Sequence, residues 1–367
     1  RQMCIRDRDM GYYCVDNLPI QLIDKFVELL STPNTEITKV AIGVDVRTDQ
    51  SFARVEKTLS CLRQNGMVFE VLFMDASDAV LVKRYKESRR MHPLCSAENP
   101  RIEDGIEKER SLLMKLACIT GASSGIGKEF AYLLSDLEYD LILVGRNTDA
   151  LHEIADNVAV RCKCITCDLS DEKSCVKLGK KLRKYPLDIM INNAGFGELG
   201  AFAETKLKND INMINVNIKA VHILTKAVLP GFIQRDRGYI MNVASSAGLL
   251  PGGPYMSTYY ATKAYVTSLT TAIHGELCDL KSNVHISMLC PGPVDTNFNN
   301  VANVKFALSG IPADYCAYYA LCKMFTGKLT IVPTFTMKAG VFGSRFLPRQ
   351  VLAFMTGHQQ KKKTDNI

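Results

Sequence analysis

The chain has 367 residues, of which 47% are hydrophobic and 23% charged, and its formal net charge is +7. This composition excludes a disordered chain and a coiled coil. At about 100 to 200 residues per domain, the length predicts two domains or one domain with a large appendage. Three consecutive lysines, Lys361 to Lys363, are interpreted as a solvated tail, so charge alone does not indicate nucleic acid binding.

Thirteen cysteines are spread along the chain, and we find no signal-peptide pattern. We therefore expect reduced thiols and a cytoplasmic location. The alternative is a zinc site in the cluster of Cys162, Cys164, Cys167 and Cys175, which contains one C-x-x-C pair. We expect no metal, because that stretch has the pattern of a buried strand and no second ligand pair follows. No apolar run approaches the ~18 residues of a membrane span, so we expect no transmembrane segment.

The first eight residues, "RQMCIRDR", show no hydrophobic period. They look like the translation of an adapter used in preparing sequencing libraries, so we interpret residues 1–8 as an artefact and leave them out of the fold. From Asp9 to Leu113 the pattern becomes α/β. The stretch "PIQLIDKFVELL" has helical spacing, and "KVAIGVDV" and "VFEVLFMDA" are continuous apolar runs of the kind found in parallel strands.

The phrases "DMGYYCVDNLP", "GVDVRT" and "LFMDASDAVLVKRYKESRRMHPL" resemble the N-terminal half of the bacterial RNase adapter family RapZ. The resemblance covers nearly all of Asp9 to Leu113 and implies an incomplete P-loop-type α/β domain. In that family the Walker A loop lies shortly before the "GYYCVDN" element, and residues 1–8 take that place here. Asp75 ends a run of Walker B form, and Asp45 to Thr48 matches a nucleotide-contact segment. Without the phosphate loop, we interpret Asp45 and Asp75 as strand-end carboxylates.

The resemblance to RapZ implies one alternative function, a regulatory module that binds ATP or GTP. The RNA-adapter function of that family depends on a C-terminal half that this chain lacks, so we expect no RNA or ribonuclease partner. After Leu113 the pattern changes again, and Met114 has the place and context of an initiator for a second domain.

A short apolar strand, "KLACIT", leads into the glycine-rich turn "GASSGIG" and then into the helical pattern "KEFAYLLSDL". Gly121 permits a tight bend, Gly125 lets the backbone approach a pyrophosphate, and Gly127 lets the helix pack against the strand. The free N–H groups at the start of the helix would then meet the anion. We interpret the turn as a dinucleotide-binding turn.

Two other interpretations of this turn were weighed. A Walker A loop needs a glycine where Ala122 stands and a hydroxyl where Glu129 stands, so its spacing fails. A nucleophile elbow fits the form G-x-S-x-G with Ser123 as the nucleophile, and it would need His274 or His285 as a partner. Neither histidine is in an evident catalytic loop, so we do not expect a hydrolase.

Three motifs follow one another in order, namely T-G-x-x-x-G-x-G from Thr120 to Gly127, "NNAG" at Asn192 to Gly195, and Tyr259-x-x-x-Lys263. Together they resemble the short-chain dehydrogenase/reductase family. The resemblance runs from Met114 to the C-terminus and implies a Rossmann doubly wound parallel sheet. The apolar runs "DLILVG", "CKCITCDL", "DIMINN", "GYIMNVAS" and "HISMLC" agree with its strands. The chain is thus predicted to be α/β throughout, with a P-loop-type fragment at 9–113 and this domain at 114–367.

The resemblance implies that Tyr259 is the general acid or base for hydride transfer between a nicotinamide cofactor and a carbonyl or secondary alcohol. Tyr259 and Lys263 are one helical turn apart, and we expect the nearby cation to lower the pKa of the tyrosine. The phrase "NVASSAG" matches the family's catalytic serine at Ser245, with Ser246 as the alternative. Asn217 matches a helix asparagine that holds a proton-relay water in that family.

The side chain that selects between NADP and NAD is expected at the end of the second strand. Arg146 stands there and suits the 2′-phosphate of NADP, with Ser123 and Lys128 as possible additional contacts. We therefore predict NADP, with NAD as the alternative. The residues expected to bind this cofactor are Thr120, Gly121, Ser123, Ser124, Gly125, Ile126, Gly127, Arg146, Asn147, Asp168, Leu169, Asn193, Ala194, Gly195, Tyr259, Lys263, Pro291, Gly292, Val294 and Thr296.

The substrate is expected to be a small carbonyl compound or alcohol, recognised by the segment after Phe298 and by loops such as "GFGELGAF". The family resemblance implies a homo-oligomer. The C-terminal stretch "FGSRFLPRQVLAFMTGHQQKKK" is basic and amphipathic. We expect it to dock as a helix on its own domain, with a membrane surface or a partner as the alternative.

Overall fold

The computed structural model describes residues 12–15, 18, 22, 23, 25, 26, 39–43, 115–296 and 310–364. The chain forms two compact units, Arg1–Met114 and Lys115–Ile367. In the first unit, β1 (Tyr13–Val15) and β2 (Val40–Ile42) pair in parallel, as expected for the predicted strand "KVAIGVDV". The other elements predicted in this unit, together with Asp45 and Asp75, lie outside the described residues.

The second unit is built on a parallel sheet, which among its described residues has seven strands in the order β11-β8-β7-β6-β3-β4-β5. The order reverses between β3 and β6, so this is a doubly wound sheet, and the predicted Rossmann fold is confirmed.

The described elements of this unit are β3 (Leu116–Thr120), α6 (Gly125–Asp136), β4 (Asp140–Gly145), α7 (Thr148–Asp156), β5 (Cys162–Thr166), α8 (Glu172–Leu182), β6 (Ile189–Asn192), α9 (Leu207–Ile214), η2 (Asn215–Ala220), α10 (Val221–Arg235), β7 (Tyr239–Val243), η3 (Ser246–Leu249), α11 (Ser257–Asp279), β8 (His285–Leu289), β9 (Val294–Asp295), β10 (Ile311–Pro312), α13 (Ala313–Phe325), β11 (Thr330–Ile331), α14 (Phe335–Ser344) and α15 (Arg349–Thr364).

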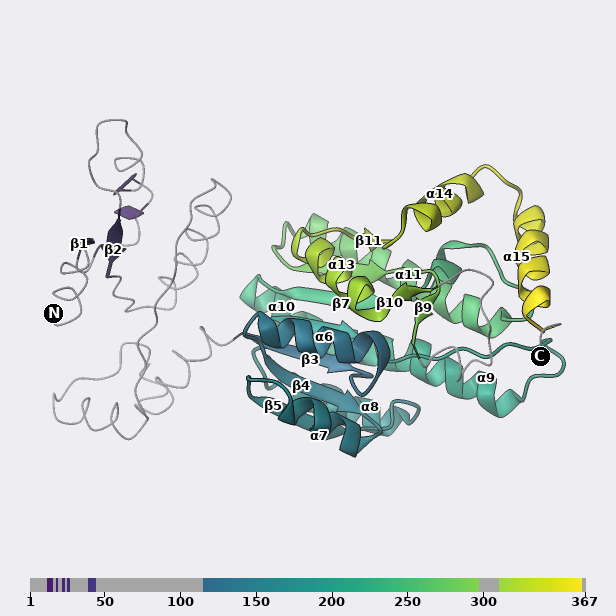
Figure 1. Cartoon of the computed structure of the whole chain (residues 1–367), viewed down its shortest axis with the longest axis horizontal. Coiled ribbons are helices and arrows are strands. Elements are labelled where there is room, and N and C mark those ends of the chain that lie inside the picture. Colours follow the sequence, from purple (N-terminus) through teal and green to yellow (C-terminus); the bar gives the residue numbers. More distant parts are fainter. Residues whose placement is uncertain are drawn as a thin grey trace. The chain divides into compact units, whose positions relative to one another are not determined.

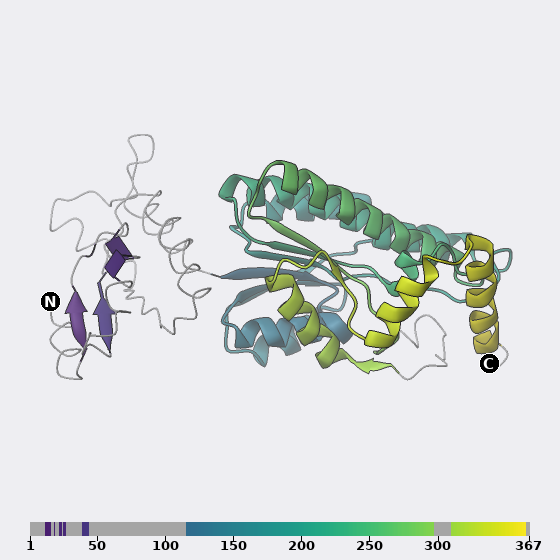
Figure 2. The same cartoon turned by 90° about the horizontal axis from the view of Figure 1, so that it is seen from above.

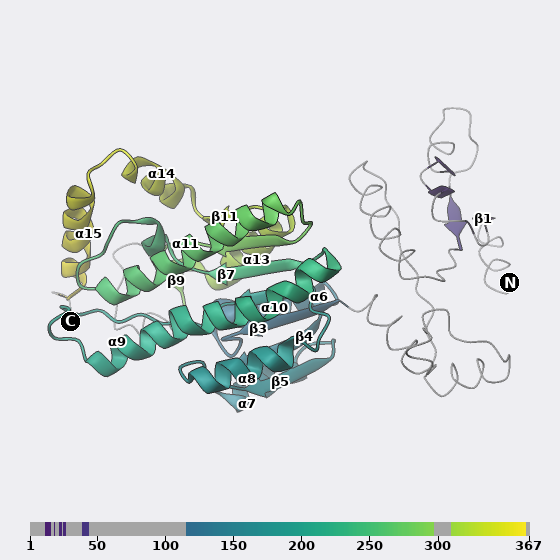
Figure 3. The ribbon, with the colours of Figure 1, turned by 180° about the vertical axis from the view of Figure 1, so that it is seen from behind.

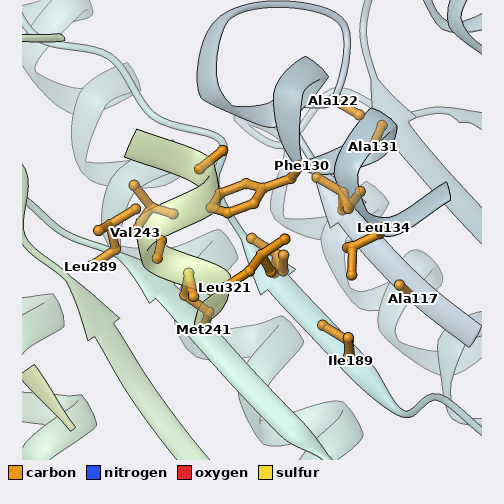
Figure 4. Packing of buried hydrophobic residues seen from close by; sticks show 14 of the residues in the cluster. Ala117, Ala122, Phe130, Ala131, Leu134, Ile189, Met241, Val243, Leu289 and Leu321 are labelled. Atoms are coloured by element: carbon orange, nitrogen blue, oxygen red, sulfur yellow. The ribbon is translucent and has the colours of Figure 1, made fainter. Parts of the chain in front are cut away.

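Helices cover both faces of this sheet, so its strands are apolar on both sides. Along β3, Ala117 and Ile119 face α6 and α13, whereas Cys118 belongs to the core under α8, α10 and α11. Figure 1 shows α6, α7 and α13 over one face, and Figure 3 shows α8 and α10 over the other. In the first core, Phe130 of α6 packs with Leu321 of α13 over the strands (Figure 4). The central apolar runs in the sequence are therefore strands buried on both faces. The prediction of a buried strand is wrong for β5, which is at the edge of the sheet and is only partly buried.

The C-terminal helices extend the unit beyond the sheet. Figure 2 shows α14 and α15 at the end of the unit where α11 begins. The hydroxyl of Thr356 in α15 donates to the carbonyl of Gly252 at 3.1 Å, and Nε2 of Gln360 donates to the Tyr260 hydroxyl at 3.2 Å. Leu352 is buried one turn before Thr356. One face of α15 thus docks on its own domain, as the sequence predicts.

The continuous helix from Leu207 to Arg235, formed by α9, η2 and α10, is long and apolar enough to cross a membrane by length and composition. This differs from the prediction of no such segment, which looked for an uninterrupted apolar run. On the side of this helix that packs on the sheet, Leu224, Val228 and Phe232 join the second core. Such core helices pass the same composition test as membrane spans.

Candidate active site

A cavity of about 1310 Å³ lies at the carboxyl ends of the strands, beside the place where the strand order reverses. In open α/β sheets this is where ligands bind. The glycine-rich turn after β3, the ends of β4 and β7, and the start of α11 all contribute residues to its wall. The motifs from distant parts of the sequence therefore meet at one site.

The three glycines of the turn have the geometry that their assigned roles require. Gly121 and Gly125 have φ of +64° and +55°, where other residues are strained. A Cβ on Gly121 would lie 2.8 Å from Cα of Ala194, and one on Gly127 would lie 2.2 Å from the carbonyl oxygen of Gly121. The turn is thus closed against the next loop, with no room for side chains.

A substitution at Gly127 tests how tightly the turn is packed. Gly127→Ala is expected to destabilise the unit by about 1 to 3 kcal/mol, because its Cβ must displace backbone. Gly275→Ala is the matched control, since that glycine is in α11 with nothing within 4 Å of its Cβ position. The control is expected to stabilise by about 0.5 to 1 kcal/mol. Urea unfolding followed by circular dichroism measures both, and equal effects would contradict the packing described here.

Thr120 and Asn193 hold the turn to the neighbouring loop. The Thr120 hydroxyl accepts from the backbone N–H groups of Asn193 at 3.0 Å and Ala194 at 3.2 Å. In return, Nδ2 of Asn193 donates to the carbonyls of Thr120 and Gly121. Thr120 and Gly127 do not line the cavity, which differs from their prediction as cofactor contacts. Thr120 and Gly127 instead hold the glycine-rich turn in the conformation in which its other residues face the cavity.

The start of α6 faces the cavity with its N–H groups uncapped by a side chain. Ser124 is in the N-cap position, and its hydroxyl makes no capping hydrogen bond. Ser123, Ser124, Gly125 and Ile126 all line the cavity. Uncapped N–H groups at a helix start favour an anion. This geometry suits the phosphates of a dinucleotide.

At the end of β4, Arg146 is exposed and lines the cavity together with Asn147 and Asp168. The side chain of Asn147 also caps α7 by accepting from Ala150 N at 3.2 Å. Hydrogen bonds from Ser170 hold the pKa of Asp168 below its usual value, and the charge of Arg146 adds to this effect. A cation and a carboxylate therefore stand side by side at this end of the cavity.

Lys128, the second predicted helper of Arg146, does not line the cavity. Its Nζ lies over the ring of Tyr132, 5.6 Å from the ring centroid, one turn further along α6. Ser123 does line the cavity and approaches Gly145 closely. The remaining predicted cofactor residues that line it are Gly121, Leu169, Asn193, Ala194, Gly195, Pro291, Gly292, Val294 and Thr296.

Ser245, Tyr259 and Lys263 come together in the wall of the same cavity. Tyr259 and Ser245 share a side-chain hydrogen bond, and both line the cavity. Nζ of Lys263 is 5.9 Å from the centroid of the Tyr259 ring and donates to the Val243 carbonyl at 2.8 Å. Ser246 also lines the cavity but starts η3, with its N–H bonded to Pro291 O. The hydrogen bond to Tyr259 distinguishes Ser245 from Ser246.

The predicted effect of Lys263 on Tyr259 is wrong for the protein alone. Burial raises the pKa of Tyr259 to about 12, and the hydrogen bond from Ser245 only partly opposes this. Burial also lowers the pKa of Lys263 to about 8. A solvated lysine beside the phenol would lower the pKa of Tyr259. In the structure, however, protein surrounds both Tyr259 and Lys263 and disfavours the charged form of each.

The lowered pKa of Lys263 has a measurable consequence for stability. Between pH 8 and 10.5 the unfolded lysine binds a proton that the folded lysine does not, so the free energy of unfolding should rise with pH. Lys263→Met lacks this contribution, and its stability relative to the natural chain should fall by roughly 3 kcal/mol across that window. Urea unfolding of both chains at pH 8 and pH 10.5 measures the difference in the free energy of unfolding. The titration of the cysteines and tyrosines contributes equally to both chains and so cancels from this difference. A difference independent of pH would contradict the buried position.

Asn217 lies beneath the cavity and not in its wall. It is in the π-helical turn η2 and fully buried, and its side chain bonds to both backbone polar groups of Phe196 and to the Thr262 hydroxyl. A Cβ on Gly195 would lie 3.1 Å from both Asn217 Oδ1 and Lys263 Nζ, so these two groups meet under that glycine. The water-holding role of Asn217 stays a prediction, while its contacts are those of a positioning residue.

The structure also places the residues of the nucleophile elbow and of the zinc site, the two alternatives that the sequence did not favour. His285 is at the amino end of β8 and stacks on Tyr239, on the edge of the sheet away from Ser123, and His274 pairs with Cys278 in α11. Neither histidine lines the cavity that Ser123 lines. In the cysteine cluster, Cys164 and Cys175 donate to backbone carbonyls. Within the described residues, no three His, Cys, Asp or Glu side chains are grouped as metal ligands.

Several residues of the cavity were not predicted. Tyr260 and Val216 line it from helices next to the motifs, whereas Phe196 comes from the loop "GFGELGAF", which was expected from the sequence to contact the substrate. A further set comes from α14 and α15, including Leu352 and Gln360. The signal for this set was the apolar spacing of the C-terminal stretch, which was interpreted as docking but not as part of the site. The segment expected to recognise the substrate, after Phe298, lies outside the described residues as far as residue 309.

Comparison with known families gives the same assignment as the geometry. Residues 115–305, more than half of the chain, match the model of the short chain dehydrogenase family. The chain belongs to this family. The unit of residues 115–367 is therefore an NAD(P)-dependent oxidoreductase with a Rossmann-like fold.

Solved structures of short-chain dehydrogenases resemble this dehydrogenase unit. One is a short-chain dehydrogenase from Sphingobium yanoikuyae in complex with NADPH, 28% identical, with a TM-score of 0.58 over 63% of this chain and 94% of that one. Another is the bulky-bulky ketone specific alcohol dehydrogenase from Comamonas testosteroni, 25% identical, with a TM-score of 0.54 over 64% of this chain and 99% of that one.

The first part of the chain matches a different family. Residues 4–131 match the model of the RapZ-like N-terminal domain, which confirms the predicted resemblance. The match begins within residues 1–8 and overlaps the dehydrogenase match at 115–131. A nucleotide-binding protein of Agathobacter rectalis is 52% identical over 108 residues, covering 29% of this chain and 36% of that protein. The chain thus spans about a third of the length of the curated relatives that it matches.

Proposed function

We propose that residues 115–367 catalyse the NADP(H)-dependent interconversion of a carbonyl compound and a secondary alcohol. The observation that carries this proposal is the hydrogen-bonded pair of Ser245 and Tyr259, with Lys263 beside it, in the same cavity as the glycine-rich turn. A proton donor, a hydroxyl that can orient a substrate oxygen and a phosphate-binding turn are what this reaction requires.

The residues present fit a dinucleotide. The close packing of Gly121 and Gly127 leaves the backbone of the turn bare, and the uncapped start of α6 offers N–H groups to phosphate. Arg146 would bind the 2′-phosphate of NADP, and Asp168 would accept from the adenine amine. The NADPH in the Sphingobium yanoikuyae relative supports the choice of NADP.

The protein's own groups would move the proton. NADPH, when bound, supplies the hydride to the carbonyl carbon, and the reverse reaction returns it to NADP⁺. Tyr259 donates its phenolic proton to the carbonyl oxygen in the direction of reduction and accepts it from the alcohol in the direction of oxidation. Ser245 donates a hydrogen bond to the same oxygen as charge develops there. Lys263, beside the ring, stabilises the phenolate that remains.

The proposal is tested by following the oxidation of NADPH by the full chain across a panel of ketones and aldehydes. Turnover that requires a carbonyl compound, and its reversal with NADP⁺ and the matching secondary alcohol, are the expected results. NADPH binding without turnover of any carbonyl in the panel would contradict the reaction. A preference for NADH over NADPH would contradict the cofactor.

A second function is supported by the match to the RapZ-like domain, whose curated relatives are nucleotide-binding proteins. In this candidate, residues 9–113 bind ATP or GTP and regulate the dehydrogenase. Equilibrium binding of labelled ATP and GTP to the full chain tests the idea, and it is lost if neither nucleotide binds at millimolar concentration. The cytoplasmic location and homo-oligomeric state expected from the sequence remain part of the proposal.

A further inference from the structure

The cavity that holds Tyr259 extends well beyond it. Its volume of about 1310 Å³ exceeds the ~300 to 1,000 Å³ typical of small-molecule sites. The chain after η3 and the helices α14 and α15 contribute residues to its wall, and we call the part of the cavity that they line the arm. Apolar side chains that line this arm include Leu250, Met256, Met337, Val341, Leu352 and Met355.

No charged side chain among the described residues lines this arm. Among the described residues that line the cavity, the charged ones are Arg146, Asp168 and Lys263, and all three belong to the predicted cofactor and proton-transfer groups. The hydroxyl of Thr356 in the arm donates to backbone carbonyls, among them Gly252 O at 3.1 Å. An arm of this composition favours a hydrocarbon and disfavours an ionised group.

We propose that the substrate is an uncharged carbonyl compound or secondary alcohol with a hydrocarbon part of several carbons, which lies in the arm formed by α14 and α15. This inference rests on the proposed function and specifies its substrate class. Each methylene that leaves water for the arm should improve kcat/KM about fourfold until the arm is full.

The test uses the full chain, NADPH and a series of 2-alkanones from butanone to decanone. The value of kcat/KM is expected to rise with chain length and to be at least tenfold lower for a keto acid of matched length. Met355→Glu, which places a carboxylate in the arm, should remove most of the gain with chain length. Val351→Glu is the matched control, because Val351 is similarly exposed on the same helix (43% against 50%) but does not line the cavity.

A second readout separates this inference from the reaction itself. Long 2-alkanones should displace an apolar fluorescent dye from the natural chain and from Val351→Glu, but not from Met355→Glu. Displacement without any turnover would overturn the proposed reaction and leave the arm as a hydrocarbon site. Turnover with no dependence on chain length, or a preference for the keto acid, would overturn the inference.

The outer surface of α14 and α15 exposes several aromatic side chains. None of the ten residues of α14 is buried, although the helix includes Phe335 and Phe342, which are 81% and 60% exposed. Phe346 and Phe354 are exposed by 74% and 77%. We call these four phenylalanines the aromatic face. Single exposed apolar residues are ordinary, but four phenylalanines within twenty residues indicate a surface that contacts something other than water.

The charge around the aromatic face is entirely positive in the sequence. From Phe335 to Lys363 there is no Asp or Glu, and the basic residues are Lys338, Arg345, Arg349, Lys361, Lys362 and Lys363. Arg345 directly follows α14 and Arg349 begins α15, and both are exposed. Two copies of such a surface would repel each other, whereas an anionic lipid surface complements both its charge and its aromatic rings.

We infer that the aromatic face rests on the surface of a membrane that contains anionic lipids. Aromatic rings would enter the boundary between headgroups and acyl chains, and each Lys or Arg near the surface should strengthen binding about fivefold. Phe346 belongs both to this face and to the lining of the cavity.

Co-sedimentation of the full chain with vesicles tests this surface. The natural chain is expected to sediment with vesicles of phosphatidylcholine and phosphatidylglycerol and to remain in solution with phosphatidylcholine alone. The double variants Phe342→Ser/Phe354→Ser and Arg345→Gln/Arg349→Gln should each lower sedimentation at least tenfold. Tyr318→Ser, a control at an exposed ring of α13, should not.

Circular dichroism would show that the variants fold, as their exposure predicts. No binding of the natural chain to anionic vesicles would overturn the inference, as would binding that the double variants do not change. Concentration-dependent self-association that is lost in Phe342→Ser/Phe354→Ser, without vesicle binding, would instead identify a second copy of the chain as the occupant.

Discussion

Replacing Tyr259 with phenylalanine is expected to lower kcat for carbonyl reduction by about 10²- to 10⁴-fold, the usual contribution of a positioned general acid. The ring should stay in place, because its neighbours Ser245 and Lys263 are held by their own backbone contacts. The dissociation constant for NADPH should therefore remain nearly unchanged. Stopped-flow measurement of NADPH oxidation and equilibrium titration of NADPH fluorescence provide the two values.

Tyr260 provides the matched control for this variant. It is the adjacent tyrosine of α11, it lines the same cavity, and its hydroxyl accepts a hydrogen bond from Gln360. Tyr260→Phe removes the same atom from the neighbouring position, so it should leave the chemical step almost unaffected. If Tyr259→Phe kept full turnover, or if both variants lost it equally, the assignment of Tyr259 as the proton donor would be wrong.

The second large effect is expected at Arg146. Arg146→Ala should raise the KM for NADPH about 10- to 100-fold, because a charge-assisted hydrogen bond to phosphate contributes about 1.5 to 3 kcal/mol. The KM for NADH should change little, since NADH has a hydroxyl in place of the 2′-phosphate. Steady-state kinetics with both cofactors and one saturating carbonyl substrate measure the change in preference.

Arg161 serves as the control for loss of a basic residue. It is exposed, is paired with Asp140 at 2.7 Å, and does not line the cavity. Arg161→Ala should leave both KM values unchanged. An equal loss of affinity for NADPH and NADH in Arg146→Ala would indicate that Arg146 acts on a part common to both cofactors, which would contradict its role in selecting NADP.

The sequence predicted the dehydrogenase fold well because its strands are local, continuous apolar runs separated by helical patterns. The doubly wound order follows from that alternation once connections are right-handed. The glycine-rich turn was also predictable, since the requirement for positive φ at Gly121 and Gly125 is a property of single residues. These features depend on short stretches of chain.

The less successful predictions depended on the surroundings of a side chain. Thr120 is in the family motif, but its hydroxyl faces the backbone of Asn193 and not the cavity. The pKa of Tyr259 rises because protein surrounds it, which spacing along a helix does not reveal. Leu352 joins the site only through the docking of α15 across a long sequence separation. A motif identifies which residues are near one another but not which way each atom faces.

The placement of the two ends of the dehydrogenase unit affects how the protein can be handled. Lys115 immediately precedes β3, so it is at the amino edge of a parallel sheet, whereas the cavity is at the carboxyl edge. Gln360 lines the cavity only a few residues before the end of α15. An affinity tag or a surface attachment introduced before Lys115 should therefore leave the opening accessible. The same tag after residue 364 would be anchored beside the arm, and an immobilised enzyme attached there would be hindered at its entrance.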